Sequence, residues 1–384
     1  MAEFARLPPL GLYVHFPWCE RKCPYCDFNS HEHQGPLPEM DYVQALLKDL
    51  EQDLPFVWGR RISSLFIGGG TPSLLTPAAL DILLAGLRAR LPMTSRIEIT
   101  VEANPGTVDR VKLKAYRDLG INRLSLGVQS FHDEFLTRLG RIHSAAQAQQ
   151  AIDAAISVGF DNINIDLMYG LPGQSVAQAV ADVQIAVTSG AQHISYYQLT
   201  IEPNTYFAHH PPILPHDHTL ESVEHQGLSV LQQAGYGRYE ISAFALAGFE
   251  CQHNCNYWEF GDYLGIGAGA HAKLSQQQQV FRYEKIKNPK TYMEKIAAGQ
   301  SVRRERGLNS EDLSLEFMMN ALRLKHGFSP QLFCERTGLD VKTLQHLIKK
   351  PLSLGLLEQG EARIAATTKG YGLLNSVLQE FLTA

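Results

Sequence analysis

The chain has no long apolar run and no strong excess of charge of either sign. Hydrophobic residues make up 45% and charged residues 19% of its 384 residues, and the net charge is −5. This balance is typical of an ordinary globular protein, and it excludes both charge-driven disorder and a hydrophobic bilayer span. The net charge gives no general reason to expect nucleic acid or acidic lipid as a partner.

The N-terminus also lacks the pattern of a secretory signal. Glu3, Pro8 and Pro9 stand where a signal peptide would need basic residues followed by an apolar core. We therefore expect a cytoplasmic protein. Reduced thiols persist in that compartment, so clustered cysteines there favour metal or redox chemistry over disulfides.

Cysteine is scarce, and half of the six cysteines fall in one short stretch. Cys19, Cys23 and Cys26 are spaced Cys-x-x-x-Cys-x-x-Cys just after an expected strand, Leu12–Phe16. Three thiolates on a short loop suit a cubane iron-sulfur cluster with one iron left open. Two alternatives are a structural zinc or inert buried thiols; the candidates for a fourth zinc ligand are His15, His31 and His33.

From Leu10 to about Ser242, short β-rich runs alternate with amphipathic helical stretches, which is typical of βα units around a parallel sheet. The expected strands are Leu12–Phe16, Ser64–Ile67, Ile97–Val101, Arg123–Leu126, Asn162–Leu167 and His193–Leu199, with Tyr239–Ser242 as a candidate seventh. The expected helices are Met40–Leu54, Pro77–Leu91, Val108–Leu119, Ala145–Val158 and Val176–Ser189. We therefore predict an α/β fold, a partial (β/α)6 TIM-like barrel over residues 1–274, with the carboxyl ends of the strands on one rim.

Glycine-rich and polar segments follow the expected strands on that rim. The second strand leads into Gly68, Gly69 and Gly70, which would let a ligand approach the backbone closely. Later strand ends and loops contribute Glu102, Gln129, Arg141 and Asp166. Each residue alone is more often a turn, a solvated charge or a helix cap, but together they suit a zwitterionic, sugar-bearing ligand.

These features together resemble those of radical S-adenosylmethionine (SAM) proteins. The resemblance rests on the three-cysteine loop after the first strand, the glycine-rich loop after the second and the polar residues that end later strands. It implies a [4Fe-4S] cluster on Cys19, Cys23 and Cys26, with the amine and carboxylate of SAM on the open iron. It also implies reductive cleavage of SAM to a 5′-deoxyadenosyl radical.

Within this superfamily, four segments resemble the oxygen-independent coproporphyrinogen III oxidase family. They are Tyr13–Cys19, Phe66–Pro72, Gly127–Phe131 and Asp166–Gly173. Carried over by motif, the resemblance implies that Tyr13 and Tyr25 flank the cluster and the adenosyl group. It also implies a SAM site in which the methionine part packs on Gly69, Gly70 and Thr71, and the rest is bound by Glu102, Gln129, Arg141 and Asp166.

Two differences separate the sequence from the oxidases of that family. The oxidases continue the cluster motif as Cys-x-Cys, whereas Phe28 follows Asp27 here. The sequence also lacks the N-terminal extension that the oxidases carry ahead of the first strand. Both differences favour the sister group of haem chaperones, which are thought to bind haem and pass it to target proteins.

A later motif agrees with the chaperone interpretation. The segment His253–Trp258 matches the His-Asn-x-x-Tyr-Trp pattern of that sister group and implies His253 as a haem ligand. Tyr257 and Trp258 would offer flat aromatic faces to the macrocycle. The alternatives are that Cys255 is the ligand, or that the aromatics belong to the core and His253 is a hydrogen-bonded loop residue.

The last third of the chain changes character. The polar run Ser275–Gln279 begins a stretch that we interpret as a linker, residues 275–309. Residues 310–384 predict a C-terminal, mostly helical, winged-helix-like domain with a hairpin at Leu356–Ala365 and a closing helix at Lys369–Leu382. Acidic residues are scattered through it and leave no basic stripe, so protein contact or a lid over the barrel is favoured over nucleic acid.

The sequence as a whole therefore predicts a haem chaperone that carries a [4Fe-4S] cluster and SAM, binds haem and delivers it to haem-accepting proteins. Membrane contact is expected only through a membrane-bound acceptor. The alternative is an oxygen-independent coproporphyrinogen III oxidase that uses the 5′-deoxyadenosyl radical. Catalytic activity of the chain is left open.

Overall fold

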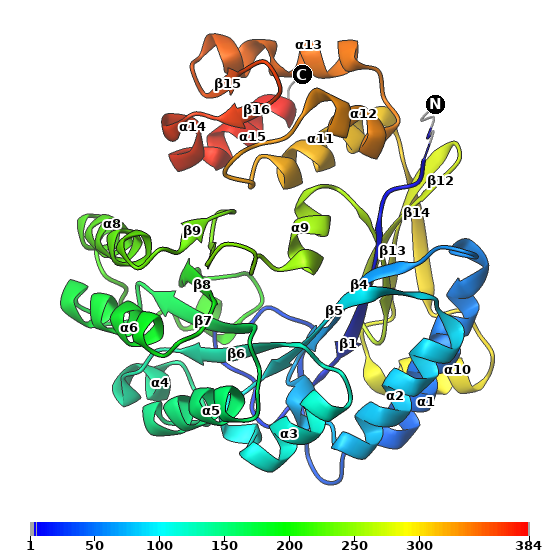
Figure 1. Cartoon of the computed structure of the whole chain (residues 1–384), viewed down its shortest axis with the longest axis vertical. Coiled ribbons are helices and arrows are strands. Elements are labelled where there is room, and N and C mark those ends of the chain that lie inside the picture. The colour runs from blue at the N-terminus through cyan, green and yellow to red at the C-terminus, as the bar shows by residue number, and fades with distance from the viewer. Residues whose placement is uncertain (1–3, 5, 383–384) are drawn as a thin grey trace.

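One large sheet organises the chain. The computed structural model describes residue 4 and residues 6–382. Its main sheet has 12 strands in the order β14-β13-β12-β11-β1-β4-β5-β6-β7-β8-β10-β9. The parallel strands of the predicted barrel are β1 (Leu10–Phe16), β4 (Ile62–Gly69), β5 (Met93–Ala103), β6 (Arg123–Gln129), β7 (Ile163–Tyr169) and β8 (His193–Gln198). Helices cover the outer face of this curved sheet (Figure 1).

The helices between these strands confirm the predicted βα alternation. They are α1 (Glu39–Asp53), α2 (Pro77–Arg90), α3 (Arg110–Asp118), α5 (Ala145–Ser157) and α6 (Val176–Thr188). Ser144 and Ser175 begin α5 and α6 with capping boxes, in which side chain and backbone satisfy each other's donors. Each helix buries an apolar face on the sheet, as Leu83 and Leu87 of α2 do. The carboxyl ends of the parallel strands consequently share one rim.

The sheet continues beyond the predicted barrel at both edges. Beside β1 lie β11 (Asp262–Ile266), which is parallel to it, and then the antiparallel strands β12 (His271–Gln276), β13 (Gln279–Lys285) and β14 (Arg303–Leu308). Beside β8 lie β10 (Ala243–Ala245) and β9 (Gly237–Arg238). The predicted strand Tyr239–Ser242 is wrong, because those residues connect β9 to β10.

The stretch interpreted as a linker, residues 275–309, is mostly strand and helix. It contains β13, β14 and α10 (Pro289–Ala297), and its polar run of glutamines forms the turn between β12 and β13. Tyr283 and Tyr292 are buried in the main core, which explains why the segment is folded despite its polar start. The linker prediction is therefore wrong: the polar residues belong to a hairpin turn between two strands of the main sheet.

Residues beyond β14 form a separate, mostly helical part with its own core. Its elements are α11 (Ser310–Ala321), α12 (Pro330–Thr337), α13 (Val341–Ser353), β15 (Leu357–Gln359), β16 (Ile364–Ala366), α14 (Thr368–Gly372) and α15 (Leu374–Leu382). Phe317 packs edge-on against Phe328 and Phe333 at its centre. The predicted hairpin is confirmed, while the predicted closing helix is divided at Leu373 into α14 and α15.

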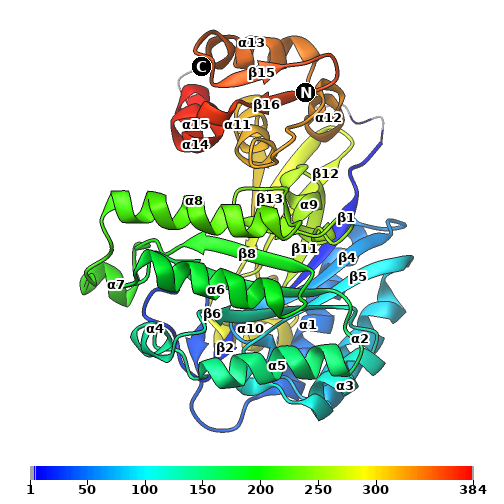
Figure 2. The same cartoon turned by 60° about the vertical axis from the view of Figure 1, so that its left-hand side comes forward.

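This C-terminal part lies at the floor of the barrel, opposite the rim. Figure 2 places it at the other end of the molecule from β2 (Trp18–Cys19), which carries the first cysteine of the motif. Its core includes Phe260 and contacts Ile241, both from the floor side. The expectation of a lid over the barrel is therefore wrong. Within the described part of the chain, no helix is long and apolar enough to cross a membrane.

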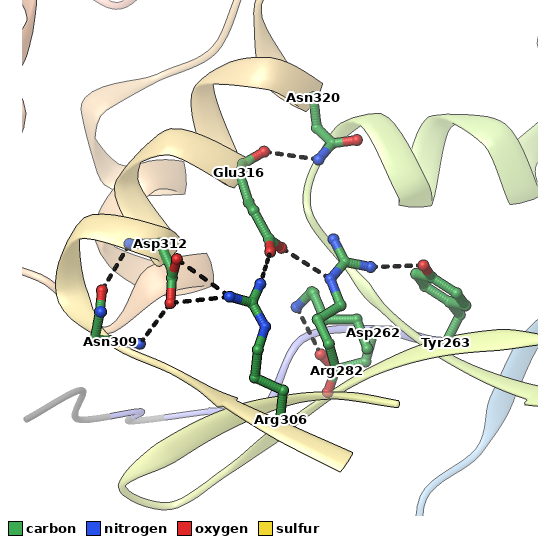
Figure 3. A network of polar contacts seen from close by, with 9 residues as sticks. Asp262, Tyr263, Arg282, Arg306, Asn309, Asp312, Glu316 and Asn320 are labelled. Carbon is green, nitrogen blue, oxygen red and sulfur yellow. Dashed lines mark hydrogen bonds and ion pairs between the residues drawn. The ribbon is translucent and has the colours of Figure 1, made fainter. Parts of the chain in front are cut away.

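Charged side chains fasten the C-terminal part to the sheet (Figure 3). Arg282 of β13 donates from Nε to Glu316 of α11 over 2.8 Å and from Nη1 to the hydroxyl of Tyr263 over 2.6 Å. Arg306 of β14 contacts the other oxygen of Glu316 over 3.3 Å. Two strands thus hold one carboxylate of α11, which fixes the angle of that helix on the sheet.

Asp262 is the buried charge at the base of this network. Its carboxylate accepts from Lys273 Nζ over 2.8 Å and from the amide of Ser275 over 3.0 Å, and it pairs with Arg60 over 2.8 Å. Burial acts to raise the pKa of this carboxyl, but Lys273 and Arg60 outweigh it and leave the pKa below 3.8.

We predict that Asp262→Asn lowers the free energy of unfolding by about 3 to 5 kcal/mol at pH 7, because it leaves Lys273 buried without its partner. The folded pKa is below 3.8, so the contribution of Asp262 is present above that pH and is lost as the pH falls through the folded value. Urea denaturation at pH 7 and at progressively lower pH should show the difference from wild type shrinking below about pH 4. Glu51→Gln, which breaks a surface pair with Arg90, should cost less than about 1 kcal/mol, and an equal loss in both variants would refute this account.

Candidate functional site

The cysteine loop is closed at its base by two short strands. β2 pairs in parallel with β3 (His31–Glu32), so the two ends of the loop between them lie side by side at the rim. The amide of Cys26 donates to the carbonyl of Cys23 over 3.1 Å in a turn within the loop. Cys19, Cys23 and Cys26 all line a cavity of about 440 Å³. Phe28, 59% exposed, lies at the border of the same cavity in place of a fourth thiol.

Two of the three histidines considered as zinc ligands, His15 and His31, are engaged elsewhere. His15 is buried, with Nδ1 3.0 Å from the hydroxyl of Tyr13 and Nε2 2.9 Å from the carbonyl of Asn29. Burial lowers the pKa of His15 to about 4. His31 Nε2 lies 3.3 Å from the side-chain oxygen of Asn29. Over residues 4 and 6–382, no group of three histidine, cysteine or acidic side chains is arranged to hold a single metal ion.

The glycine-rich loop packs directly on the cysteine loop. The amides of Gly70 and Thr71 donate to the carbonyls of Phe16 and Trp18 over 2.7 and 2.8 Å. A Cβ on Gly70 would stand 2.6 Å from the Trp18 carbonyl oxygen, and one on Gly69 would stand 2.6 Å from the His15 ring. Gly69 also has a φ of +115°. These glycines are therefore required by the close packing of the two loops, and Gly69, Gly70 and Thr71 also line the cavity.

Two carboxylates face the cavity from the barrel wall. Glu102 Oε2 accepts from the amide of Gly69 over 3.1 Å. Asp166 accepts from Asn164 over 2.8 Å and from Ser125 over 3.5 Å. Burial, and then repulsion from Asp166, raise the pKa of Glu102 to about 8, and burial also raises the pKa of Asp166. Neither has an ion-pair partner among the described side chains, so the pair is prepared for a cationic ligand.

Gln129, Arg141 and Tyr25 complete the predicted cavity wall. Gln129 has a φ of +71°, unusual for a residue other than glycine, and accepts a hydrogen bond from the Tyr197 hydroxyl over 2.7 Å. Arg141 donates from Nη2 to the Gly127 carbonyl over 2.7 Å. Tyr25, Gln129 and Arg141 all line the cavity.

Tyr13 does not line this cavity. Its ring lies one layer deeper in the barrel, stacked on Phe66 with a centroid distance of 6.3 Å, and its hydroxyl meets His15. The structure therefore brings the other predicted cluster and SAM residues together around one hollow and leaves Tyr13 below it. Among residues that sequence reasoning missed, Ser125 and Tyr197 face the same hollow, and the inward alternation of β6 and β8 could have identified them.

The segment predicted to bind haem closes the floor of the barrel. It forms α9 (Gln252–Trp258), whose first amides, those of Gln252 and His253, donate to the carboxylate of Glu98 inside the barrel, each over 3.2 Å. His253 Nδ1 lies 3.0 Å from Ser64 Oγ, and the ring packs on Phe66 at 5.2 Å. Burial lowers the pKa of His253 to about 4, and the residue does not line the cysteine cavity.

The aromatics of α9 pack between the two parts of the chain. Tyr257 contacts Trp258 edge-on at 4.9 Å and Tyr263 at 5.2 Å, and the Arg323 guanidinium lies 4.3 Å above the Trp258 ring. Cys255 instead lines a second cavity of about 370 Å³, against the C-terminal part. The motif therefore serves as packing between the barrel and the C-terminal part in this conformation.

The cavity residues fit a cluster with a bound zwitterionic nucleotide. Three thiols converge from one loop, the border keeps a non-ligating Phe28, and two carboxylates without ion-pair partners face the same space. Such a set suits a cluster that keeps one iron open.

Comparison with known proteins agrees with this geometry. The Radical SAM superfamily model matches residues 13–184, and the HemN C-terminal domain model matches residues 308–373. The E. coli coproporphyrinogen III oxidase HemN, described as a radical SAM enzyme, superposes with a TM-score of 0.83 at 23% identity, covering 98% of this chain and 90% of that one. Fold and site thus define a radical SAM protein.

Full-length relatives identify the family more closely. "Heme chaperone HemW" of Escherichia coli K12 is 45% identical over 378 residues, covering 98% of this chain and 99% of the relative. The protein of the same name from Haemophilus influenzae is 44% identical over 383 residues, and that from Bacillus subtilis is 34% identical over 381. The match to the H. influenzae protein covers 98% of this chain and 99% of the relative. The match to the B. subtilis protein covers 96% of this chain and 98% of the relative. The chain belongs to the HemW family, which confirms the predicted resemblance.

We predict that Glu102→Gln stabilises the ligand-free protein at alkaline pH. The fold favours the protonated carboxyl, so wild-type stability falls as the pH rises from about 4.5 to about 8, whereas glutamine has no proton to lose. Urea denaturation measures the free energy of unfolding of both proteins at pH 5.5 and 8.5. Between these pH values, the difference between variant and wild type should change by at least about 1.4 kcal/mol in favour of the variant, which corresponds to a shift of one pKa unit. A difference that stays constant between these two pH values would contradict the raised pKa of Glu102.

Proposed function

We propose that this protein is a haem chaperone, which binds haem and delivers it to haem-accepting proteins. The observation that carries this proposal is full-length similarity, at up to 45% identity, to relatives named for that function. We propose a cytoplasmic location, with membrane contact only through a membrane-bound acceptor.

We further propose that Cys19, Cys23 and Cys26 hold the [4Fe-4S] cluster and that the cavity beside them holds SAM. When bound, the cluster supplies one-electron reduction chemistry. Glu102 and Asp166 would attract the positive charge of SAM, and Thr71 would close the methionine end. Gln129, held by the Tyr197 hydroxyl, would fix the orientation of the nucleotide. Bringing a cation next to Glu102 would favour release of its proton.

His253 is our candidate iron ligand, on the argument of its motif. In the described conformation its imidazole is hydrogen-bonded to Ser64 and packed on Phe66, so ligation of haem requires α9 to leave the barrel floor. The contacts of α9 with Glu98 and with Arg323 would then have to break. Haem binding through His253 should therefore be coupled to loosening of the C-terminal part.

We predict that anaerobic reconstitution with iron and sulfide loads the wild type and fails in Cys19→Ser, Cys23→Ser and Cys26→Ser. Each substitution removes one of three thiolate ligands. Iron and sulfide analysis and the visible spectrum measure the loading. Cys334→Ser, which alters a half-buried thiol of the C-terminal part, is the matched control and should load normally. Loading of Cys19→Ser to the wild-type level would exclude this site.

We predict that the protein binds haem and passes it to a haem-free acceptor, and that His253→Ala loses most of the binding. Absorption titration measures binding, and recovery of holo-acceptor measures transfer. His346→Ala, which removes an exposed histidine on α13, should behave as wild type. Absence of stable haem binding by the intact protein would reject the proposal, and anaerobic conversion of coproporphyrinogen III to protoporphyrinogen would establish the oxidase function instead.

A further inference from the structure

The turn between β11 and β12 packs closely against β1 and against the end of the cysteine loop. A Cβ on Gly267 would collide with the carbonyl of His15, and one on Gly269 would collide with the side-chain amide of Asn29. Both glycines also have a positive φ, +106° and +81°. The glycines that follow β11 are therefore required by this contact and by the backbone conformation of the turn.

Asn29, three residues after the last cysteine of the motif, provides the main polar bonds of this contact. Its Nδ2 donates to the carbonyls of Ala268 and Lys287, each over 2.9 Å. A carbonyl can only accept, so both donors of the amide are used. The two partners lie 239 and 258 residues later in the sequence, in the turn after β11 and in the connection from β13 to α10. One side chain thus joins the cysteine loop to two distant turns.

The backbone of Asn29 is held from the opposite side by β1. Its carbonyl accepts a hydrogen bond from His15 Nε2 over 2.9 Å. Nε2 therefore carries the hydrogen, and His15 Nδ1 accepts from the hydroxyl of Tyr13 over 3.0 Å. Side chain and backbone together fix Asn29 between the first strand and the extension of the sheet.

The residue after Asn29 carries this constraint to a cysteine. Ser30 is buried, and its Oγ lies 3.7 Å from Cys26 Sγ, where a hydroxyl can donate to a thiolate. Shortly afterwards the amide of His33 donates to the carbonyl of Cys19 over 3.0 Å, which closes the loop. The place of Asn29 therefore sets where Cys26 lies and where the chain returns to the rim.

From these contacts we infer that Asn29 holds the cysteine loop in the form that retains the cluster, by fastening the end of the loop to the turns at Ala268 and Lys287. The inference rests on the proposed cluster at the three cysteines. A loop that is ordered before iron arrives loses less conformational freedom on binding, so it holds the cluster more tightly. Asn29 is a positioning residue, since it acts on Cys26 through Ser30.

The test compares Asn29→Ala and Asn29→Gln with wild type, each reconstituted anaerobically with iron and sulfide. The rate of iron release to an added chelator measures retention, and electron paramagnetic resonance of the reduced cluster measures its uniformity. In Asn29→Ala we expect iron release to be at least about tenfold faster, as is typical when a residue that supports a metal ligand is removed. Its resonance should also broaden, because the unfastened loop holds the cluster in more than one arrangement. Asn29→Gln keeps the amide on a longer side chain and should fall between the two.

Asn288→Ala is the matched control. It removes an asparagine next to Lys287 whose side chain accepts from the amide of Thr291 over 2.9 Å and caps α10. It should release iron at the wild-type rate. Hydrogen exchange of the apoprotein separates local from general effects: in Asn29→Ala the amide of His33 should exchange faster, whereas the amides of β7 should stay protected as in wild type.

Equal release rates and equal spectra in loaded wild type and Asn29→Ala would overturn the inference. Equally fast release from Asn288→Ala, or loss of protection throughout β7 in both Asn29 variants, would also overturn it, because either result means a general loss of structure. Failure of Asn29→Ala to load at all, with β7 still protected, would support it. Wild type that assembles no cluster would instead reject the proposed cofactor.

Discussion

The rim is arranged around two buried carboxylates, Glu102 and Asp166, which share a cavity and have no ion-pair partner among the described side chains. On the other side of the fold, a lysine from a distant strand neutralises two buried acids: Lys285 of β13 pairs with Asp49 and Asp53 of α1 over 2.6 and 2.7 Å. At the rim, Glu102 and Asp166 receive hydrogen bonds from an amide, a side-chain amide and a hydroxyl but form no ion pair among the described side chains. Arg123 acts to lower the pKa of both and Arg141 that of Asp166, but burial outweighs these charges and leaves both pKa values raised. Such a pair costs stability in the ligand-free protein, and a bound cation relieves that cost. The contrast between the two regions marks the rim as the place where a ligand completes the protein.

At the floor of the barrel, the buried carboxylate is satisfied by backbone amides. Glu98 also lies inside, but it accepts from the first amides of α9, so its charge is spread over a helix end that fits inside the sheet. The same short helix presents Trp258 to Arg323 of the C-terminal part. One segment therefore closes the barrel and contacts the C-terminal part. The rim is suited to bind ligands, whereas the floor forms the contact between the barrel and the C-terminal part.

Much of the rim could be predicted from the sequence because parallel strands impose it. Once β4, β5 and β7 are recognised, their carboxyl ends must meet, and Gly69, Glu102 and Asp166 follow. Arg141 could be placed near the site but not given its contacts, because these depend on how the turn at Gly140 packs on Pro24.

The deep position of His253 had no comparable signal in the sequence. Nothing in the residues around His253 shows that α9 inserts into the barrel. The hydrogen-bond partner of His253 there, Ser64, lies 189 residues earlier in the sequence. The strands β13 and β14 were assigned to a linker for a related reason, because the polar run Ser275–Gln279 does not show that the chain around it pairs with the main sheet. Contacts across long sequence separations decide these cases, and local pattern does not contain them.

The register of β1 has a consequence for how the protein is made. β1 pairs with β4 on one side and with β11 on the other, so the strand that leads into Cys19 acquires its second neighbour only when residues 262–266 have left the ribosome. Until then β1 is an edge strand with unpaired backbone groups, a template for wrong pairing. A chain that folds as it emerges would therefore carry its cysteine loop on an incomplete sheet until these residues appear, well past the middle of the 384-residue sequence.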